Sequence, residues 1–158
     1  SLAHADPSSE IPLCLAMLGG EVILKSASGE RRLGAADFQT GMLSTAKRDD
    51  EMLIAARFPI AEAGTGYAFN EMAQRRGDFA IVAVAATVSA SKIRFGVGGV
   101  ADKPTIAEWG NIAGDELDDA LNAFAWELGG YDDVHATARY RRELVRRLGR
   151  RVIEEART

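Results

Sequence analysis

The chain has 158 residues, of which 47% are hydrophobic and 27% charged, a composition typical of folded domains and unlike that of disordered chains. Its single cysteine, Cys14, excludes an internal disulfide and a cysteine-based iron–sulfur site within these residues. The formal net charge of −4 hides an asymmetry, because residues 139–158 hold eight Arg and three Glu and carry +5, so that residues 1–138 carry −9.

The first part of the sequence predicts one helix followed by antiparallel strands. Ser8 or Ser9 is a suitable N-cap, and Gly19-Gly20 ends the apolar periodicity that follows. The buried face of this helix is expected to carry Ile11, Cys14, Leu15 and Leu18. A β-hairpin, a short helix or turn, and a strand ended by Pro59 are then expected over residues 21–33, 37–41 and 51–58.

The second part predicts three antiparallel strands and two closing helices. The strands are expected over residues 67–73, 80–89 and 93–100, and residues 105–109 are expected to form a short helical turn. The first helix starts near four acidic residues at 115–119 and ends at Gly129-Gly130. In the last helix, over residues 137–155, the inward positions are expected to be Tyr140, Leu144, Leu148 and Val152, with most arginines on the other face.

This order of elements predicts an α+β protein with antiparallel sheets and argues against a parallel doubly wound fold. The expected architecture is a helix with antiparallel strands, followed by a three-stranded antiparallel sheet packed with the C-terminal helices. Gly96-Val97-Gly98-Gly99 ends a strand without opening a helix, so it indicates a close backbone contact and not a Rossmann nucleotide site. No apolar run is long enough for a transmembrane helix, and the single cysteine fits a cytoplasmic protein.

Several stretches share their order and spacing with one known family. They are Ser-Leu-Ala-His-Ala-Asp-Pro at residues 1–7, and residues 51–59, 69–82, 98–104 and 140–144. Together they resemble the FAD-binding medium subunits of molybdenum hydroxylases, that is, of carbon monoxide dehydrogenase-like enzymes, which are related to the flavin domain of xanthine dehydrogenase. The resemblance implies that residues 1–59 are the C-terminal part of an FAD-binding domain and that residues 60–158 are the family's C-terminal domain.

The resemblance also implies a cofactor, partners and a reaction. The cofactor is FAD, and the partners are an iron–sulfur small subunit and a molybdopterin large subunit. Electrons would pass from the iron–sulfur clusters through FAD to an external acceptor. The family's two glycine-rich phosphate loops are not found in this sequence, so we expect them upstream of Ser1 in a longer protein, and we expect these residues alone to bind FAD poorly or not at all.

Carried over residue by residue, the resemblance implies contacts along one side of the flavin. Ser1 ends the second phosphate loop, and the turn after it lies near the cofactor. Glu10 accepts hydrogen bonds from the sugar-alcohol chain, and the backbone of a later strand meets the isoalloxazine edge. Asn70 takes a position where relatives can carry a lysine. The implied cofactor-binding residues are Ser1, His4, Ala5, Asp6, Glu10, Leu53, Ile54 and Asn70.

Simpler interpretations remain open beside these. Asp6-Pro7 is a good turn in any protein, and Glu10 can act only on the helix dipole. Residues 75–78 can form a solvated turn with an ion pair. No residue is a convincing acid, base or nucleophile, so the alternative function is a non-catalytic module that braces a flavin or iron–sulfur partner. Nucleic acid is not expected as a partner, because glutamates interrupt the basic last helix; a solvated or partner-facing surface is favoured there.

Overall fold

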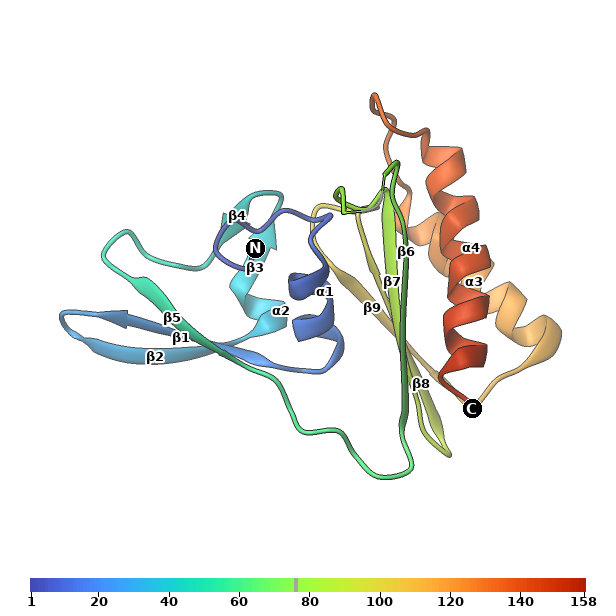
Figure 1. Ribbon diagram of the computed structural model, residues 1–158, viewed down its shortest axis with the longest axis horizontal. Coiled ribbons are helices and arrows are strands. Elements are labelled where there is room, and N and C mark those ends of the chain that lie inside the picture. The colour runs from blue at the N-terminus through green and yellow to red at the C-terminus, as the bar shows by residue number, and fades with distance from the viewer. Residues whose placement is uncertain (76) are drawn as a thin grey trace.

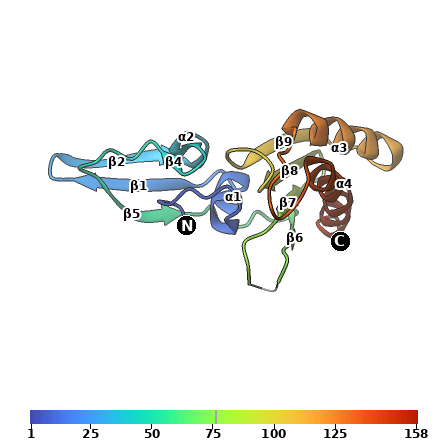
Figure 2. The same cartoon turned by 90° about the horizontal axis from the view of Figure 1, so that it is seen from above.

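Two antiparallel sheets lie on either side of one short helix in the computed structural model, which describes residues 1–75 and 77–158 (Figure 1). The first sheet has the strand order β2-β1-β5 and the second the order β6-β7-β8-β9. Helix α1 lies between the sheets, and helices α3 and α4 cover the far face of the second sheet (Figure 2). The fold is therefore layered, and the predicted α+β class is confirmed.

All strand pairs among the described residues are antiparallel. In chain order the elements are α1 (Glu10–Met17), β1 (Glu21–Ser26), β2 (Gly29–Gly34), α2 (Ala35–Phe38), β3 (Gln39–Gly41), β4 (Ser44–Thr45), β5 (Met52–Arg57), β6 (Gly66–Met72), β7 (Val82–Val88), β8 (Lys92–Gly98), β9 (Thr105–Gly110), α3 (Gly114–Leu128) and α4 (Ala138–Glu155). Within the described residues, no helix combines the length and the apolar character that crossing a bilayer requires.

Helix α1 is buried on two faces at once. Leu13 and Met17 pack against small alanines of the second sheet, whereas Leu15 packs with Val22 and Phe38 on the side of the first sheet. A helix that is apolar around most of its circumference is typically enclosed in this way. The expected single apolar face is wrong in part: Ile11 is 47% exposed and Cys14 is half-buried. Burial, and then the charge of Glu10, raises the pKa of the Cys14 thiol, which keeps it protonated.

The first sheet joins a local hairpin to a distant strand. Strands β1 and β2 pair from Glu21↔Gly34 to Ser26↔Gly29, which confirms the predicted hairpin. Strand β5 pairs with the other edge of β1, with a register shift between Ile23 and Leu24. The face of this sheet that carries Val22 and Leu24 points to α1 and α2, so it is closed by the same short helix that closes the second sheet.

The second sheet has four strands, and the fourth corrects a prediction. Residues 105–109, expected to form a helical turn, belong to β9, which pairs with β8 from Lys92↔Gly110 to Val97↔Thr105. The stretch alternates: Ile106 packs on the α1 side, whereas Ala107 and Trp109 pack on the side of α3 and α4. Alternation of buried and exposed residues over so few positions after Pro104 only weakly indicates a strand in the sequence. Pairing with β8 decides that the segment is a strand.

The helical layer is stabilised by an aromatic cluster, and its helices begin and end at residues suited to capping. Phe95 stacks on Trp109 at 5.8 Å between ring centroids, and Phe124 meets both rings edge-on. The hydroxyl of Thr137 caps α4 by accepting from the Tyr140 N–H at 3.2 Å. Gly129, with a φ of 72°, ends α3 at the predicted glycine pair.

One arginine of α4 is buried, contrary to the predicted arrangement. Tyr140, expected to face inward, is 45% exposed, and its neighbour Arg141 is only 2% exposed. The Arg141 Nη1 donates to the carbonyl oxygens of Ile81 and Gly99 at 2.6 and 2.8 Å, and Nη2 donates to Asp133 Oδ2 at 2.7 Å. The guanidinium thus joins α4 to the second sheet and to the loop before α4.

The two-sided burial of α1 predicts unequal effects of two substitutions on one helix. Leu13→Ala leaves a cavity against the second sheet, so it should lower the free energy of unfolding by about 3 kcal/mol. Ile11→Ala, at an exposed position, should change it by less than about 1 kcal/mol. Urea unfolding followed by circular dichroism measures both values, and equal losses would contradict the structure.

The buried network of Arg141 predicts a large loss of stability when the guanidinium is removed. Arg141→Leu leaves two carbonyl oxygens and the Asp133 carboxylate without this partner, so unfolding should become easier by about 3 kcal/mol. The matched control is Arg151→Leu at an exposed position of the same helix, with an expected change within about 0.5 kcal/mol. Thermal melts of both variants test this, and a small shift for Arg141→Leu is the result that would count against the network.

Candidate functional site

The segment before α1 forms a tight turn through its own hydrogen bonds. The Ala5 N–H donates to the Ser1 carbonyl at 3.0 Å, and Asp6 Oδ1 accepts from the Ser8 N–H at 2.8 Å. Ala5 is fully buried with a φ of 56°, a left-handed conformation that an alanine adopts only when its surroundings impose it. The predicted Asp6-Pro7 turn is therefore an ordered structure.

Both halves of the molecule hold this turn in place. The Ala5 carbonyl accepts from Gln39 Nε2 at 3.0 Å and from the Leu43 N–H at 3.1 Å. On the other side, the Pro7 carbonyl accepts from the Gly99 N–H at 2.8 Å. A Cβ on Gly98 would lie only 3.1 Å from the Pro7 oxygen, so the glycine stretch serves a close backbone contact, as the sequence predicts.

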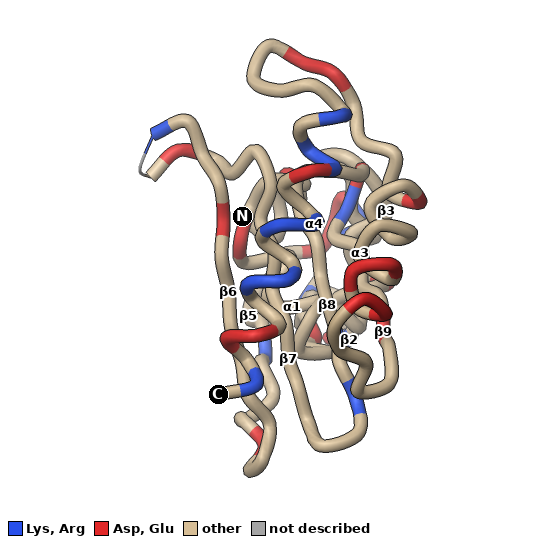
Figure 3. The backbone as a smooth tube through the Cα atoms, turned by 90° about the vertical axis from the view of Figure 1, so that its right-hand side faces the viewer, with Lys and Arg blue, Asp and Glu red and all other residues tan. Residues whose placement is uncertain are grey.

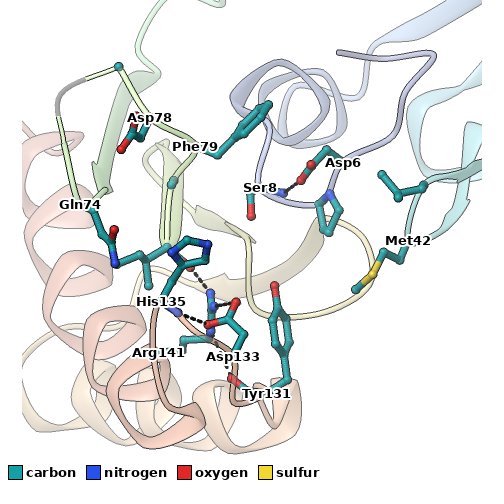
Figure 4. A pocket seen from close by; sticks show the side chains of 15 residues that line it. Asp6, Ser8, Met42, Gln74, Asp78, Phe79, Tyr131, Asp133, His135 and Arg141 are labelled. Carbon is teal, nitrogen blue, oxygen red and sulfur yellow. Dashed lines mark hydrogen bonds and ion pairs between the residues drawn. The ribbon is translucent and has the colours of Figure 1, made fainter.

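An open pocket of about 690 Å³ lies beside this turn, where four chain segments meet (Figure 4). The turn itself, the β3–β4 turn, the β6–β7 loop and the loop before α4 each contribute side chains. The labelled residues in Figure 4 are Asp6, Ser8, Met42, Gln74, Asp78, Phe79, Tyr131, Asp133, His135 and Arg141. Residues far apart in the sequence thus share one cavity, which no local pattern in the sequence could indicate.

The wall formed by the loop before α4 is held by charge pairing. Partial burial raises the pKa of Asp133, but hydrogen bonds from the Ala136 and His135 N–H groups and from Arg141 outweigh it, so the pKa lies below its usual value. The Arg141 guanidinium also stacks over the Tyr131 ring, 4.3 Å from its centroid. This wall is therefore preorganised and its carboxylate is ionised at neutral pH.

Two neighbouring carboxylates, the carboxylate pair, lie where the first turn of α1 approaches the α1-facing side of the second sheet. Glu10, in the first turn of α1, and Glu71, on the face of β6 that points to α1, are both half-buried. Burial, and then the charge of Glu10, raises the pKa of Glu71. Glu71 Oε2 is buried and has no hydrogen-bond partner among the described residues, and the same holds for Ser9 Oγ. Ionised carboxylates only accept hydrogen bonds, so this junction suits a ligand that brings donors.

The other predicted site residues are dispersed. Ser1 and His4 are exposed ahead of the turn. Leu53 packs on the face of the first sheet that points to α1 and α2, whereas Ile54 lies on the opposite, exposed face of that sheet. Asn70 pairs with Val84, whose side chain belongs to the core beneath α3 and α4, so Asn70 lies on the opposite face of β6 from Glu71.

Glu71 is the residue that sequence reasoning missed at this junction. Neighbours in a strand point to opposite faces, so Asn70 and Glu71 cannot both face α1. The sequence signal that could have identified Glu71 is the small residue Ala83 in β7, which leaves room for α1 on its face of the sheet. Glu71 pairs with Ala83, so both residues lie on that face. Arg76, part of the stretch at 75–78 that was predicted to be a solvated turn, lies outside the described residues.

A bidentate ion pair anchors the loop that leads into β5. Arg31 Nε and Nη2 donate to the two oxygens of Glu51 at 2.5 and 2.7 Å. The same Nη2 donates to the Ala46 carbonyl, and the Arg48 N–H donates to Glu51 Oε2, both at 2.7 Å. The hydrogen bonds from Arg31 are the main cause that lowers the pKa of Glu51 to about 2, against the opposing effect of burial. The start of β5, and with it Leu53 and Ile54, is thereby fixed to β2.

Both halves of the chain match known protein families. Residues 1–61 match the family described as FAD binding domain in molybdopterin dehydrogenase, and residues 67–156 match the CO dehydrogenase flavoprotein C-terminal domain. The chain belongs to the CO dehydrogenase flavoprotein family. This confirms the resemblance stated from the sequence, and it confirms FAD as the cofactor and an oxidoreductase subunit as the type of protein at the level of the family.

Individual relatives agree with this assignment. The chain is 34% identical to the nicotine 6-hydroxylase medium subunit of Paenarthrobacter nicotinovorans, with 99% of this chain and 59% of that subunit covered. It is 31% identical to the carbon monoxide dehydrogenase medium chain of Afipia carboxidovorans, covering 98% and 58%. The structure of quinoline 2-oxidoreductase from Pseudomonas putida 86 superposes with a TM-score of 0.90 at 29% identity, covering 99% and 59%. The chain thus spans just under three fifths of the length of these relatives.

The low pKa of Glu51 predicts how stability of this flavoprotein segment depends on pH. A carboxyl whose pKa is about 2 when folded and about 4.3 when unfolded stabilises the fold above the unfolded value, and this contribution is lost as the pH falls toward 2. Glu51→Gln should therefore lower the unfolding free energy at neutral pH and reduce its decline between about pH 5 and pH 3. Urea unfolding across this range measures the effect, with Glu30→Gln at an exposed position of the hairpin as control. Parallel declines in Glu51→Gln and the unaltered protein would contradict the ion pair.

Proposed function

We propose that these residues are part of the FAD-binding electron-transfer subunit of a molybdenum hydroxylase. In this function, electrons reach FAD from iron–sulfur clusters on a small subunit and leave to an external acceptor, while the substrate is oxidised on a molybdopterin large subunit. Support comes from the matches of both halves of the chain to flavoprotein families and from relatives that are medium subunits. A cytoplasmic location fits the single cysteine and stays a prediction.

The observation that carries the proposal is the carboxylate pair, Glu10 and Glu71. Burial, and then the charge of Glu10, raises the pKa of Glu71, and one buried oxygen of Glu71 has no hydrogen-bond partner among the described residues. The sugar-alcohol chain of FAD brings hydroxyl donors, which match these acceptors, so the residues fit this part of the cofactor. When bound, FAD supplies the electron transfer itself.

The task of this chain's own residues is to bind and orient. The turn before α1 is fixed by hydrogen bonds from the β3–β4 hairpin on one side and from Gly99, just after β8, on the other. The turn that contains Ala5 and Asp6 would therefore present a rigid edge to the cofactor. Leu53 and Ile54 follow the anchored Glu51, which holds their strand in place. Ser1 and His4 lie at the exposed start of the same turn. Asn70 is left out of the proposed contacts, because it lies on the other face of β6.

The described residues suit the flavin side of the cofactor better than its pyrophosphate. The space beside the glycine-rich stretch Gly96 to Gly99 is filled by α1 and the turn before it: a Cβ on Gly96 would lie 2.6 Å from Met17 Cγ. We therefore assign the phosphate-binding loops to the part of the protein that corresponds to the remaining length of its relatives. Residues 1–59 would then complete an FAD-binding domain, and residues 60–158 would form the C-terminal domain.

A second candidate function is supported by the rim of the large pocket. Met42, Leu43 and Phe79 are exposed apolar side chains around it. Clustered exposed apolar residues are typical of protein interfaces. On this interpretation the segment is a non-catalytic module that braces a flavin or iron–sulfur partner, and the flavin experiment below distinguishes the two functions.

The proposal predicts that Glu10 contributes to FAD affinity. In the full-length protein, Glu10→Ala should weaken FAD binding by about tenfold or more, because a hydrogen bond to a carboxylate contributes about 1.5–3 kcal/mol. Titration of the flavin-free protein with FAD, followed by quenching of flavin fluorescence, measures the dissociation constant. Glu62→Ala, an exposed glutamate in the segment between β5 and β6, is the control.

Two results would count against the flavin site. If Glu10→Ala and Glu62→Ala bind FAD equally well, the carboxylate pair does not contact the cofactor. If the full-length protein binds no FAD and is colourless, the electron-transfer function fails and the bracing module is favoured.

A further inference from the structure

Helices α3 and α4 lie side by side on the side of the molecule that is remote from the first sheet (Figures 1 and 2), and the seam between them is hollowed into a trough. Two hollows, of about 500 and 440 Å³, lie along it and share Glu143, Arg146 and Arg147. Their common lining makes them one continuous surface. It shares no residue with the carboxylate pair or with the large pocket beside the N-terminal turn.

This trough is basic on an acidic protein. Six arginines line it: Arg139, Arg142, Arg146, Arg147, Arg150 and Arg151. Only three acidic residues, Asp118, Glu143 and Glu154, share the lining, so it carries a net +3 although the whole chain carries −4. Figure 3 shows the basic bands gathered along α4. A partner that matches this surface must be acidic.

Several arginines are already held in position. Arg146 and Arg147 donate to Glu143 at 2.9 and 2.6 Å, and Arg150 donates to Asp118 and Glu154. By contrast, no ion pair between described residues involves Arg139 or Arg151, which lie in different hollows. Each end of the trough therefore has a cation available for an acidic group.

An aromatic platform lies within the basic surface. The guanidinium of Arg142 stacks over the Trp126 ring, 4.2 Å from its centroid, and Nη1 donates to the Gly129 carbonyl at 2.5 Å. Trp126 is nevertheless 64% exposed. An exposed tryptophan beside ordered arginines has the composition of a protein–protein hot spot, where a side chain of the partner covers the ring.

The length of the trough indicates that its ligand is extended. Arg139 and Arg151 are twelve residues apart on α4, which is about 18 Å along the helix axis. A small anion would contact one end only, whereas an extended peptide covers about 18 Å with five or six residues. The acidic residues within the lining interrupt the positive charge that a nucleic-acid backbone or an anionic membrane would need.

We infer that the α3–α4 trough binds an extended acidic segment of a partner protein, with an apolar side chain of that segment on Trp126. Carboxylates of the segment pair with Arg139 and Arg151, and its apolar side chain lies toward the Arg139 end, in the hollow that Trp126 lines. This interaction surface is independent of the flavin site, so its test does not depend on FAD binding.

The test uses the full-length protein and a fluorescein-labelled peptide of seven residues, six alternating Asp and Glu and one Phe near one end. Fluorescence anisotropy should show binding that weakens as NaCl rises from about 50 to 500 mM. The double variant Arg139→Glu, Arg151→Glu should raise the dissociation constant about tenfold or more, and Trp126→Ala should raise it severalfold. The control is Lys25→Glu, Lys103→Glu, which changes the net charge equally at exposed positions outside the trough and should leave affinity nearly unchanged.

Three results would overturn the inference. One is that the peptide does not bind. Another is that the control pair weakens binding as much as the trough pair does, which would indicate nonspecific attraction. A single-stranded oligonucleotide or vesicles with anionic lipid binding more tightly than the peptide would indicate a different class of partner. Thermal melts verify folding, and the milder pair Arg139→Gln, Arg151→Gln gives the same comparison if the charge reversal prevents folding.

Discussion

The close packing of the N-terminal turn and α1 between two sheets is the constraint on which the rest of the structure depends. Leu13 and Met17 fill the space over one sheet, and Leu15 fills the space over the other. Gly98 and Gly99 let the Pro7 backbone come within hydrogen-bonding distance. Because one short helix contributes to two cores, the two sheets cannot move apart without exposing both.

This packing also creates the candidate flavin surface. Since α1 lies against the second sheet, its first turn brings Glu10 near Glu71, although the two residues are sixty-one positions apart in the sequence. The turn before α1 borders the large pocket for the same reason. The proposed flavin-binding edge and the contact between the two family-matched segments therefore depend on the same packing, and a change in the packing would disturb both.

The arginines of helix α4 have two roles, one inside the protein and one at its surface. Arg141 points inward and joins the helix to the residue before β7, to the residue after β8 and to the loop before α4 through ordered hydrogen bonds. The other arginines remain at the surface, where they form the basic trough with α3. Burial of one guanidinium thus fixes the orientation in which the others are displayed.

The sequence by itself determined the α+β class, the β1–β2 hairpin, the end of α3 at Gly129-Gly130 and the family, because these depend on local propensities and on short motifs. Only the tertiary structure decided that residues 105–109 form a fourth strand, that Arg141 is buried in place of Tyr140, and that Glu71 rather than Asn70 faces Glu10. Hydrophobic periodicity indicates that a segment has a buried face. Which distant element covers that face, and whether a second one covers the opposite face, depends on packing between residues far apart in the chain.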